Sequence, residues 1–144
     1  MTDHPANKTF RLPALSDGER EALLETGICL CNQGRWLESH EAFEMLWRTE
    51  AAPHRDVYKA MVQIVAALHH AKLGNFRGAN RLFGRAWELL APHVAVDCSP
   101  AGIDLSAVAQ WLRPVVQNRK EHPSGMDFTT FYDTVPLTLA RCPL

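Results

Sequence analysis

The feature that most constrains this chain is an internal match between two of its segments at an offset of 40 residues. The matching positions are small, aromatic or apolar residues at helical spacing: Gly34 and Gly74, Trp36 and Phe76, Ser39 and Ala79, Phe43 and Phe83, Leu46 and Ala86, Trp47 and Trp87, Ala51 and Ala91. Repeats of about 20 to 50 residues are typical of stacked supersecondary units, and this period fits a pair of antiparallel helices. The match predicts two αα-hairpins as the scaffold.

Small and aromatic residues at steps of three and four resemble the tetratricopeptide pattern. Two such units fall short of the roughly three that a stable solenoid usually needs. We therefore expect an all-α fold of about five helices, in which a fifth helix and the C-terminal segment close the two hairpins into a compact bundle.

Local signals place the helices. Ser16 followed by Glu19 matches a capping box, which starts a helix. The third helix is apolar on most of its circumference, so it is expected at the centre of the bundle. The expected core helices cover residues 16–32, 36 to about 51, 55–73 and 76–90.

A single domain is predicted over residues 1–144, with the two-hairpin core at 16–92, a linker and fifth helix at 93–117 and an irregular tail at 118–144. Asp104 or Ser106 is expected to cap the fifth helix, and Pro114 to kink or shorten it. The tail carries apolar residues that are expected to lie over the bundle: Phe128, Phe131, Tyr132, Val135 and Leu137.

Composition excludes several classes of protein. Apolar residues make up 47% of the chain and the net charge is −1, which argues against disorder, nucleic-acid binding and adhesion to anionic membranes. The longest apolar stretch, residues 60–68, is far shorter than the roughly 20 residues of a membrane span. We expect a cytoplasmic protein whose four cysteines are thiols: Cys29, Cys31, Cys98 and Cys142.

The differences between the two copies point to a candidate site. Where the first copy has His40, Glu41 and Glu44, the second has Asn80, Arg81 and Gly84. The scaffold tolerates either set, so the packing of the repeat does not dictate the first one. His40 and Glu44 lie one turn apart on one helix face, Trp47 extends that face, and Glu41 is rotated away by about 100°.

The adjoining helix carries matching polar residues. Gln63 and His70 are seven residues apart and share a face, whereas His69 is expected to point elsewhere. If the two faces meet, His40, Glu44, Gln63 and His70 form a polar cluster that has to be hydrogen-bonded, filled by a ligand or open to solvent.

Three functions fit this cluster. The leading hypothesis is a binding module that holds a small polar ligand or a protein segment in a cleft around His40, Glu44 and Gln63. The alternative is a metal-assisted hydrolase that uses Glu41 or Glu44 as general base and His40 as acid or metal ligand; if a metal is bound, its ligands are His40, Glu44 and His70. The zinc-protease pattern lacks its second histidine, and no cofactor is predicted. The third possibility is a structural network with function in homo-oligomerisation.

A second, weaker candidate is basic. Arg77, Arg81 and Arg85 form a stripe along the fourth helix that could bind an anion. The alternative is that these arginines are solvated or pair with glutamates of the matching helix.

Three spaced segments resemble the domain-of-unknown-function 309 family. They are residues 36–47, with the pattern His-Glu-x-x-Glu-x-x-Trp, the apolar run around Gln63, and residues 74–79. The resemblance spans about residues 18–92 and implies an all-helical fold. It marks His40, Glu41, Glu44, Trp47 and Gln63, and it implies no activity.

Overall fold

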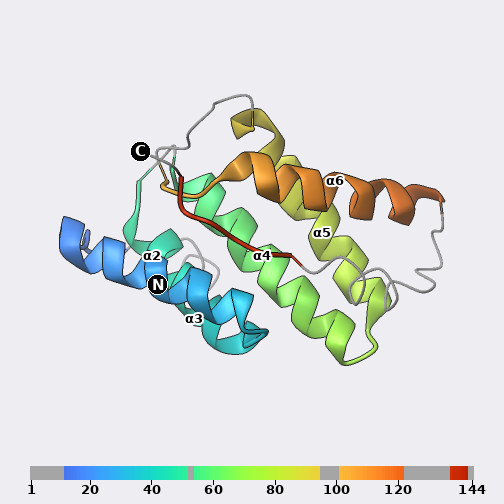
Figure 1. Cartoon of the computed structure of the whole chain (residues 1–144), viewed down its shortest axis with the longest axis horizontal. Coiled ribbons are helices and arrows are strands. Elements are labelled where there is room, and N and C mark those ends of the chain that lie inside the picture. The colour runs from blue at the N-terminus through green and yellow to red at the C-terminus, as the bar shows by residue number, and fades with distance from the viewer. Residues whose placement is uncertain (1–11, 52–53, 95–100, 122–136, 143–144) are drawn as a thin grey trace, which may run out of the picture.

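The structure, a computed structural model, describes residues 12–51, 54–94, 101–121 and 137–142, with the backbone alone for 118–121. Its elements are α2 (Asp17–Asn32), α3 (Trp36–Thr49), α4 (His54–Lys72), α5 (Phe76–Leu90), the short 3-10 helix η1 (Ala91–His93) and α6 (Leu105–Glu121) (Figure 1). Among the described residues the only β-pairing is an isolated bridge between Ile103 and Arg141. The predicted all-α bundle is confirmed.

Helix α2 begins at the predicted capping box. The Glu19 backbone N–H donates to Ser16 Oγ at 3.1 Å, and the Ser16 backbone N–H donates to Glu19 Oε1 at 2.9 Å. The two side chains satisfy backbone donors that the first turn of a helix leaves unpaired.

The turns that close α2 and α4 are built alike. Gly34 and Gly74 both adopt left-handed backbone conformations, with φ of +78° and +83°. The Gly34 N–H donates to the Cys31 carbonyl and the Gly74 N–H to the Ala71 carbonyl, both at 3.0 Å. Glycine is suited to this position because it has no Cβ to clash in the left-handed region.

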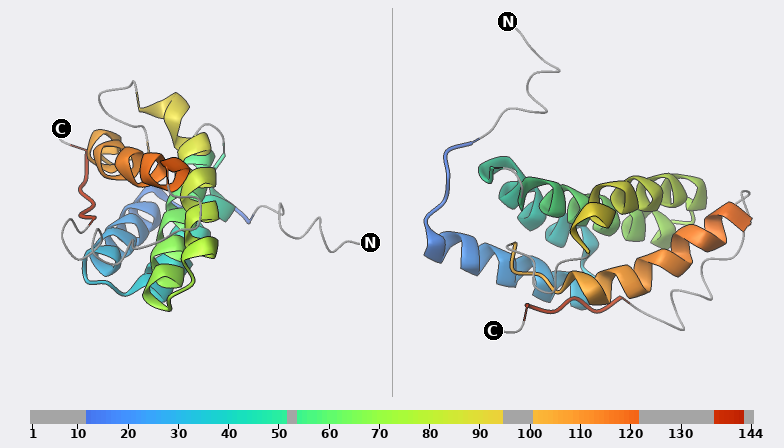
Figure 2. Two further views of the ribbon diagram at one scale, coloured as in Figure 1. Left: turned by 90° about the vertical axis from the view of Figure 1, so that its right-hand side faces the viewer. Right: turned by 90° about the horizontal axis from the view of Figure 1, so that it is seen from above.

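Helix α4 lies at the centre, as its apolar circumference predicts. Its side chains at Ala60, Met61, Ile64, Val65 and Ala67 are all 0% exposed. Helices α3 and α5 pack directly on α4, while α2 packs on α3 and α6 on α5 (Figure 2). The core therefore surrounds α4, and the other helices present their apolar faces to it.

Helix α6 is longer than predicted. It has 17 residues with Pro114 inside, so the expectation of a shortened fifth helix is wrong, and residues 118–121, which were expected to be irregular, are helical. Proline removes one backbone hydrogen bond, but buried residues continue the packed face on both sides of it: Trp111, Leu112, Val115 and Val116. Asp104 caps the helix, its Oδ1 accepting from the Ser106 N–H at 3.1 Å.

The described part of the tail, residues 137–142, runs along α2. Leu137 and Leu139 are buried, and the Asn32 side chain both donates to the Leu139 carbonyl and accepts from its N–H, at 3.0 and 2.8 Å. Arg141 pairs with Glu21 and with Glu25. The other apolar tail residues, Phe128, Phe131, Tyr132 and Val135, lie outside the described residues.

The cysteines differ from the expectation of four thiols. Cys29 is a free, exposed thiol and Cys31 a free, buried one, and burial raises the pKa of Cys31 to about 12. Cys142 is disulfide-bonded, so the expectation is wrong there. That expectation rested on the compartment alone, and spacing along the sequence does not show which cysteines the fold brings together. Cys98 lies outside the described residues.

In the part of the chain that the structure describes, every helix is too short or too polar to cross a bilayer.

The likeness of the two turns can be tested by substitution. Gly34→Ala and Gly74→Ala should each lower the free energy of unfolding by about 1 kcal/mol, because a Cβ disfavours the left-handed backbone while meeting no close neighbour. Urea denaturation measures the change. Gly18→Ala is the matched control: it lies in a helix with open space around it and should leave stability unchanged or slightly higher. A loss in only one of the two turns would contradict their equivalence.

Candidate binding site on the α3–α4 face

A hollow lies where the start of α3 meets the end of α4. It has a volume of about 210 Å³ and is lined by Trp36, Leu37 and His40 from α3 and by Ala66, His69 and His70 from α4. A second hollow of about 250 Å³ continues it toward the α2–α3 turn, because the two share Trp36, Leu37 and His69. Its further lining residues are Gly34, Arg35, Glu38 and Lys72.

The ring of His70 is held by Asn75. Asn75 caps α5: its Oδ1 accepts from the Gly78 N–H at 3.0 Å, and this bond fixes which way the amide faces. Its Nδ2 therefore donates to His70 Nδ1, at 3.1 Å. A nitrogen that accepts carries no proton, so neutral His70 keeps its hydrogen on Nε2 and has one N–H left to donate.

Trp47 lies at the other end of the α3–α4 pair, where α3 ends and α4 begins. The guanidinium of Arg55 lies 5.2 Å and the ammonium of Lys59 lies 5.4 Å from the centre of a Trp47 ring. Both distances are in the range of cation–π contacts. We call the strip that joins this end to the hollow the α3–α4 face; it comprises Trp36, His40, Glu44 and Trp47 of α3 and Lys59, Gln63, Ala66 and His70 of α4.

Several polar atoms near this face have no protein partner. Trp47 Nε1, Gln63 Oε1 and Arg55 Nε are buried and have no hydrogen-bond partner among the described residues. His40 and Glu44 are half-buried, and neither makes a hydrogen bond or ion pair with the described residues. Buried polar atoms in proteins are normally hydrogen-bonded, so these groups are available to water or to a ligand.

The structure brings together only some of the predicted site residues. His40 of α3 and His70 of α4 line one hollow, whereas Glu44 and Gln63, which are half-buried, and Glu41, which is exposed, line neither hollow. The expectation that His69 points elsewhere is wrong, because it lines the same hollow as His70. The hollow lies between the last turn of α4 and the first turns of α3. Both His69 and His70 border it, although they are successive residues.

The predicted ligand set for a metal does not assemble. Among the described residues, no group of three His, Cys, Asp or Glu side chains is arranged to hold a metal ion. His40, Glu44 and His70 therefore do not form the three-ligand arrangement that the metal hypothesis requires.

The arginine stripe lies elsewhere. Arg77, Arg81 and Arg85 are exposed on α5, and none has an ion pair with another described residue. Glu38, one of their expected partners, pairs with Arg35 instead.

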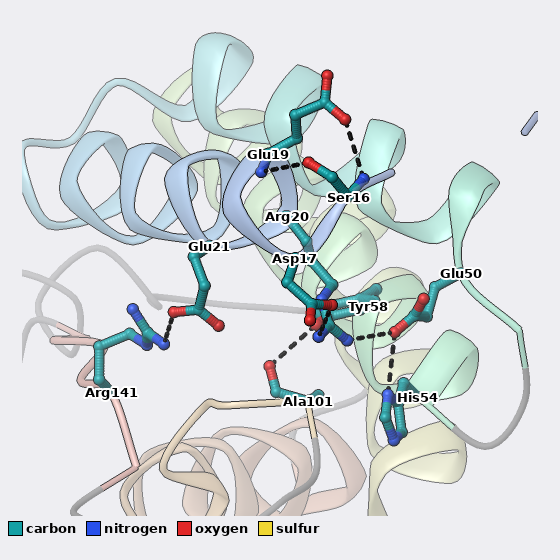
Figure 3. Close-up of polar contacts among 10 residues, drawn as sticks. All are labelled: Ser16, Asp17, Glu19, Arg20, Glu21, Glu50, His54, Tyr58, Ala101 and Arg141. Atoms are coloured by element: carbon teal, nitrogen blue, oxygen red, sulfur yellow. Dashed lines mark hydrogen bonds and ion pairs between the residues drawn. The ribbon is translucent and has the colours of Figure 1, made fainter. Parts of the chain in front are cut away.

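A polar cluster that the sequence did not predict lies at the opposite end of α4 (Figure 3). Glu50 Oε2 lies 2.9 Å from Arg20 NH1 and 3.0 Å from His54 Nδ1. The Tyr58 hydroxyl donates to the Ala101 carbonyl at 2.9 Å, and burial, with the nearby Glu50 carboxylate, raises the pKa of Tyr58 to about 12. The cluster ties together α2, the end of α3, the start of α4 and the segment before α6.

One signal for this cluster was present in the sequence. Glu50 and His54 are four residues apart, a spacing that favours an ion pair within one helix. The pair was not predicted because α3 ends before Glu50 and α4 begins at His54. The contact with Arg20 spans 30 residues and depends on tertiary structure.

The tautomer of His70 gives a test of the site geometry. Asn75→Asp keeps the helix cap but replaces the amide donor by an acceptor, so neutral His70 should move its proton from Nε2 to Nδ1. Nitrogen-15 NMR of the imidazole reports the tautomer directly, and Asp caps as well as Asn, so the thermal midpoint should change little. A wild-type His70 already protonated on Nδ1 would contradict the assigned geometry.

Comparison with known proteins identifies the domain. No curated protein and no solved structure matches this chain significantly. Residues 24–82 match the family model of the domain of unknown function (DUF309), and this segment contains both α3 and α4, and with them the whole α3–α4 face. The resemblance found in the sequence is confirmed over these residues, which match the DUF309 family model.

Proposed function

We propose that this chain is a binding module that takes a short, acidic segment of a partner protein on the α3–α4 face. An apolar side chain of the segment occupies the hollow, and a neighbouring carboxylate binds the imidazoles around it. The observation that carries the proposal is the hollow itself, where His40, His69 and His70 surround the apolar groups of Trp36, Leu37 and Ala66.

The size of the hollow favours a protein segment. Small-molecule sites usually enclose about 300 to 1,000 Å³, and this hollow measures about 210 Å³. Leu37, on its rim, is 60% exposed. An open, shallow site beside an exposed leucine fits a side chain presented by a partner better than a ligand that must be enclosed.

The polar groups favour an acceptor, and a carboxylate in particular. His70 has one ring N–H to donate because Asn75 occupies its other nitrogen. Lys72 in the adjoining hollow has no ion pair among the described residues, whereas the charge of Arg35 is matched by Glu38. Hydrogen bonds from N–H donors to a carboxylate are stronger than those to a neutral acceptor.

Three polar residues of the face, His40, Glu44 and Gln63, contribute little to the fold. A network that served stability would be internally satisfied, yet His40 and Glu44 make no polar contact with the described residues and Gln63 Oε1 is unpaired. We infer also that the two hairpins are copies of one unit, since their turns carry the same hydrogen bonds 40 residues apart. Helix α6 meets α5 as α4 meets α3, because Arg113 lies over Trp87 as Arg55 and Lys59 lie over Trp47.

The cytoplasmic location expected from the sequence stays a prediction, and disulfides such as that of Cys142 are rare in that compartment.

Nuclear magnetic resonance of the full chain tests the proposed site with two matched probes. N-acetyl-leucine has an apolar side chain and a carboxylate, and N-acetyl-leucinamide has the same side chain without the charge. We expect N-acetyl-leucine to shift the amide signals of Ala66, His69 and His70 with an affinity of about millimolar, because a probe this small has few contacts. The amide should bind more weakly.

Two variants serve as controls for this titration. His40→Ala should weaken the shifts, and Gln110→Ala, at an exposed position on α6, should leave them unchanged. Shifts that fall elsewhere, or equal binding of the two probes, would contradict the proposed site.

A further inference from the structure

Two exposed stripes occupy equivalent positions of the two hairpins and have opposite character. On α3 the stripe consists of Leu37, Glu41 and Met45, and on α5 it consists of Arg77, Arg81 and Arg85. Each pair of positions is 40 residues apart, the offset that relates the two turns. We call them the α3 stripe and the α5 stripe.

The α3 stripe has unusual apolar exposure. Leu37 is 60% and Met45 39% exposed. Among the described residues the only other exposed large apolar side chain is Leu73. Two of the three therefore flank Glu41 on one helix face, which is the pattern of a surface that another molecule covers.

The charges of the two stripes are not used within the molecule. None of the three arginines has an ion pair with a described residue, and neither has Glu41. The α5 stripe thus presents three unpaired cations, and the α3 stripe presents an unpaired carboxylate between two apolar side chains. Each stripe complements the other.

Both stripes lie on helices that pack directly on α4, and α3 and α5 are not themselves among the closely packed helix pairs. If the hairpins are copies of one unit, as inferred above, equivalent positions point in similar directions and the two stripes do not meet within one chain. A two-fold axis parallel to these helices places the α3 stripe of each chain on the α5 stripe of the other.

We propose that this chain forms a two-fold symmetric dimer in which the α3 stripe of each protomer binds the α5 stripe of its partner. At matched register Glu41 pairs with Arg81 of the partner subunit, and the aliphatic stems of the flanking arginines cover Leu37 and Met45. The net charge of −1 adds no strong repulsion between copies. This inference does not rest on the proposed function, because neither Glu41 nor Arg81 lines the hollow, but the two share Leu37, so the dimer covers one rim of the hollow.

Charge exchange tests the pairing. Light scattering after size exclusion at low salt should give a dimer for the wild type, and higher salt should weaken it. Glu41→Arg and Arg81→Glu should each weaken the dimer by roughly tenfold or more, because both symmetric contacts then place like charges together. Circular dichroism should show an unchanged helical signal for both variants, since both positions are exposed.

Two further samples restore opposite charges at positions 41 and 81 across the dimer interface. An equimolar mixture of the two single variants should form a mixed dimer, and the double variant carrying both exchanges should form a homodimer, since opposite charges again face each other. Gln110→Arg, on α6, is the control and should remain dimeric. A monomeric wild type, single variants that dimerise like the wild type, or a mixture that stays monomeric would each overturn the proposal.

Discussion

The whole arrangement depends on burying helix α4, which is apolar on most of its circumference. Residues such as Ala60, Met61, Ile64 and Val65 are fully buried although they lie on different sides of that helix. A helix with this pattern is stable in water only when other helices surround it. The positions of α2, α3, α5 and α6 around α4 follow from that requirement.

The candidate site lies where this apolar surface is interrupted. Gln63, Lys59 and His70 are the polar positions of α4 that meet α3, and they remain half-buried in the structure. Together with α3 of the first hairpin, the α4 helix of the second hairpin forms a face with a hollow at its end. The candidate site therefore lies between the two hairpins.

Local features were predictable from the sequence, and contacts between distant segments were not. The capping box at Ser16, the left-handed turn at Gly34 and the boundaries of α5 depend on neighbouring residues, so the pattern specified them. The length of α6 was missed because buried packing on both sides of Pro114 outweighs the lost hydrogen bond. The Glu50 cluster and the Cys142 disulfide depend on how segments far apart in sequence meet. At the site, helical spacing placed His40 with Glu44 and Gln63 with His70, but it could not show that His40, His69 and His70 line one hollow.

We propose that the unpartnered polar residues of the α3–α4 face serve binding and add little to the stability of the fold. Thermal denaturation of His40→Ala is the first test, because His40 lines the hollow and has no polar partner among the described residues. A substitution of this kind usually changes stability by less than about 0.5 kcal/mol, which corresponds to a shift of about 2 °C or less in the midpoint. We expect a shift within that range. A fall of roughly 5 °C or more would show that His40 holds the bundle together and would rule out this role for it.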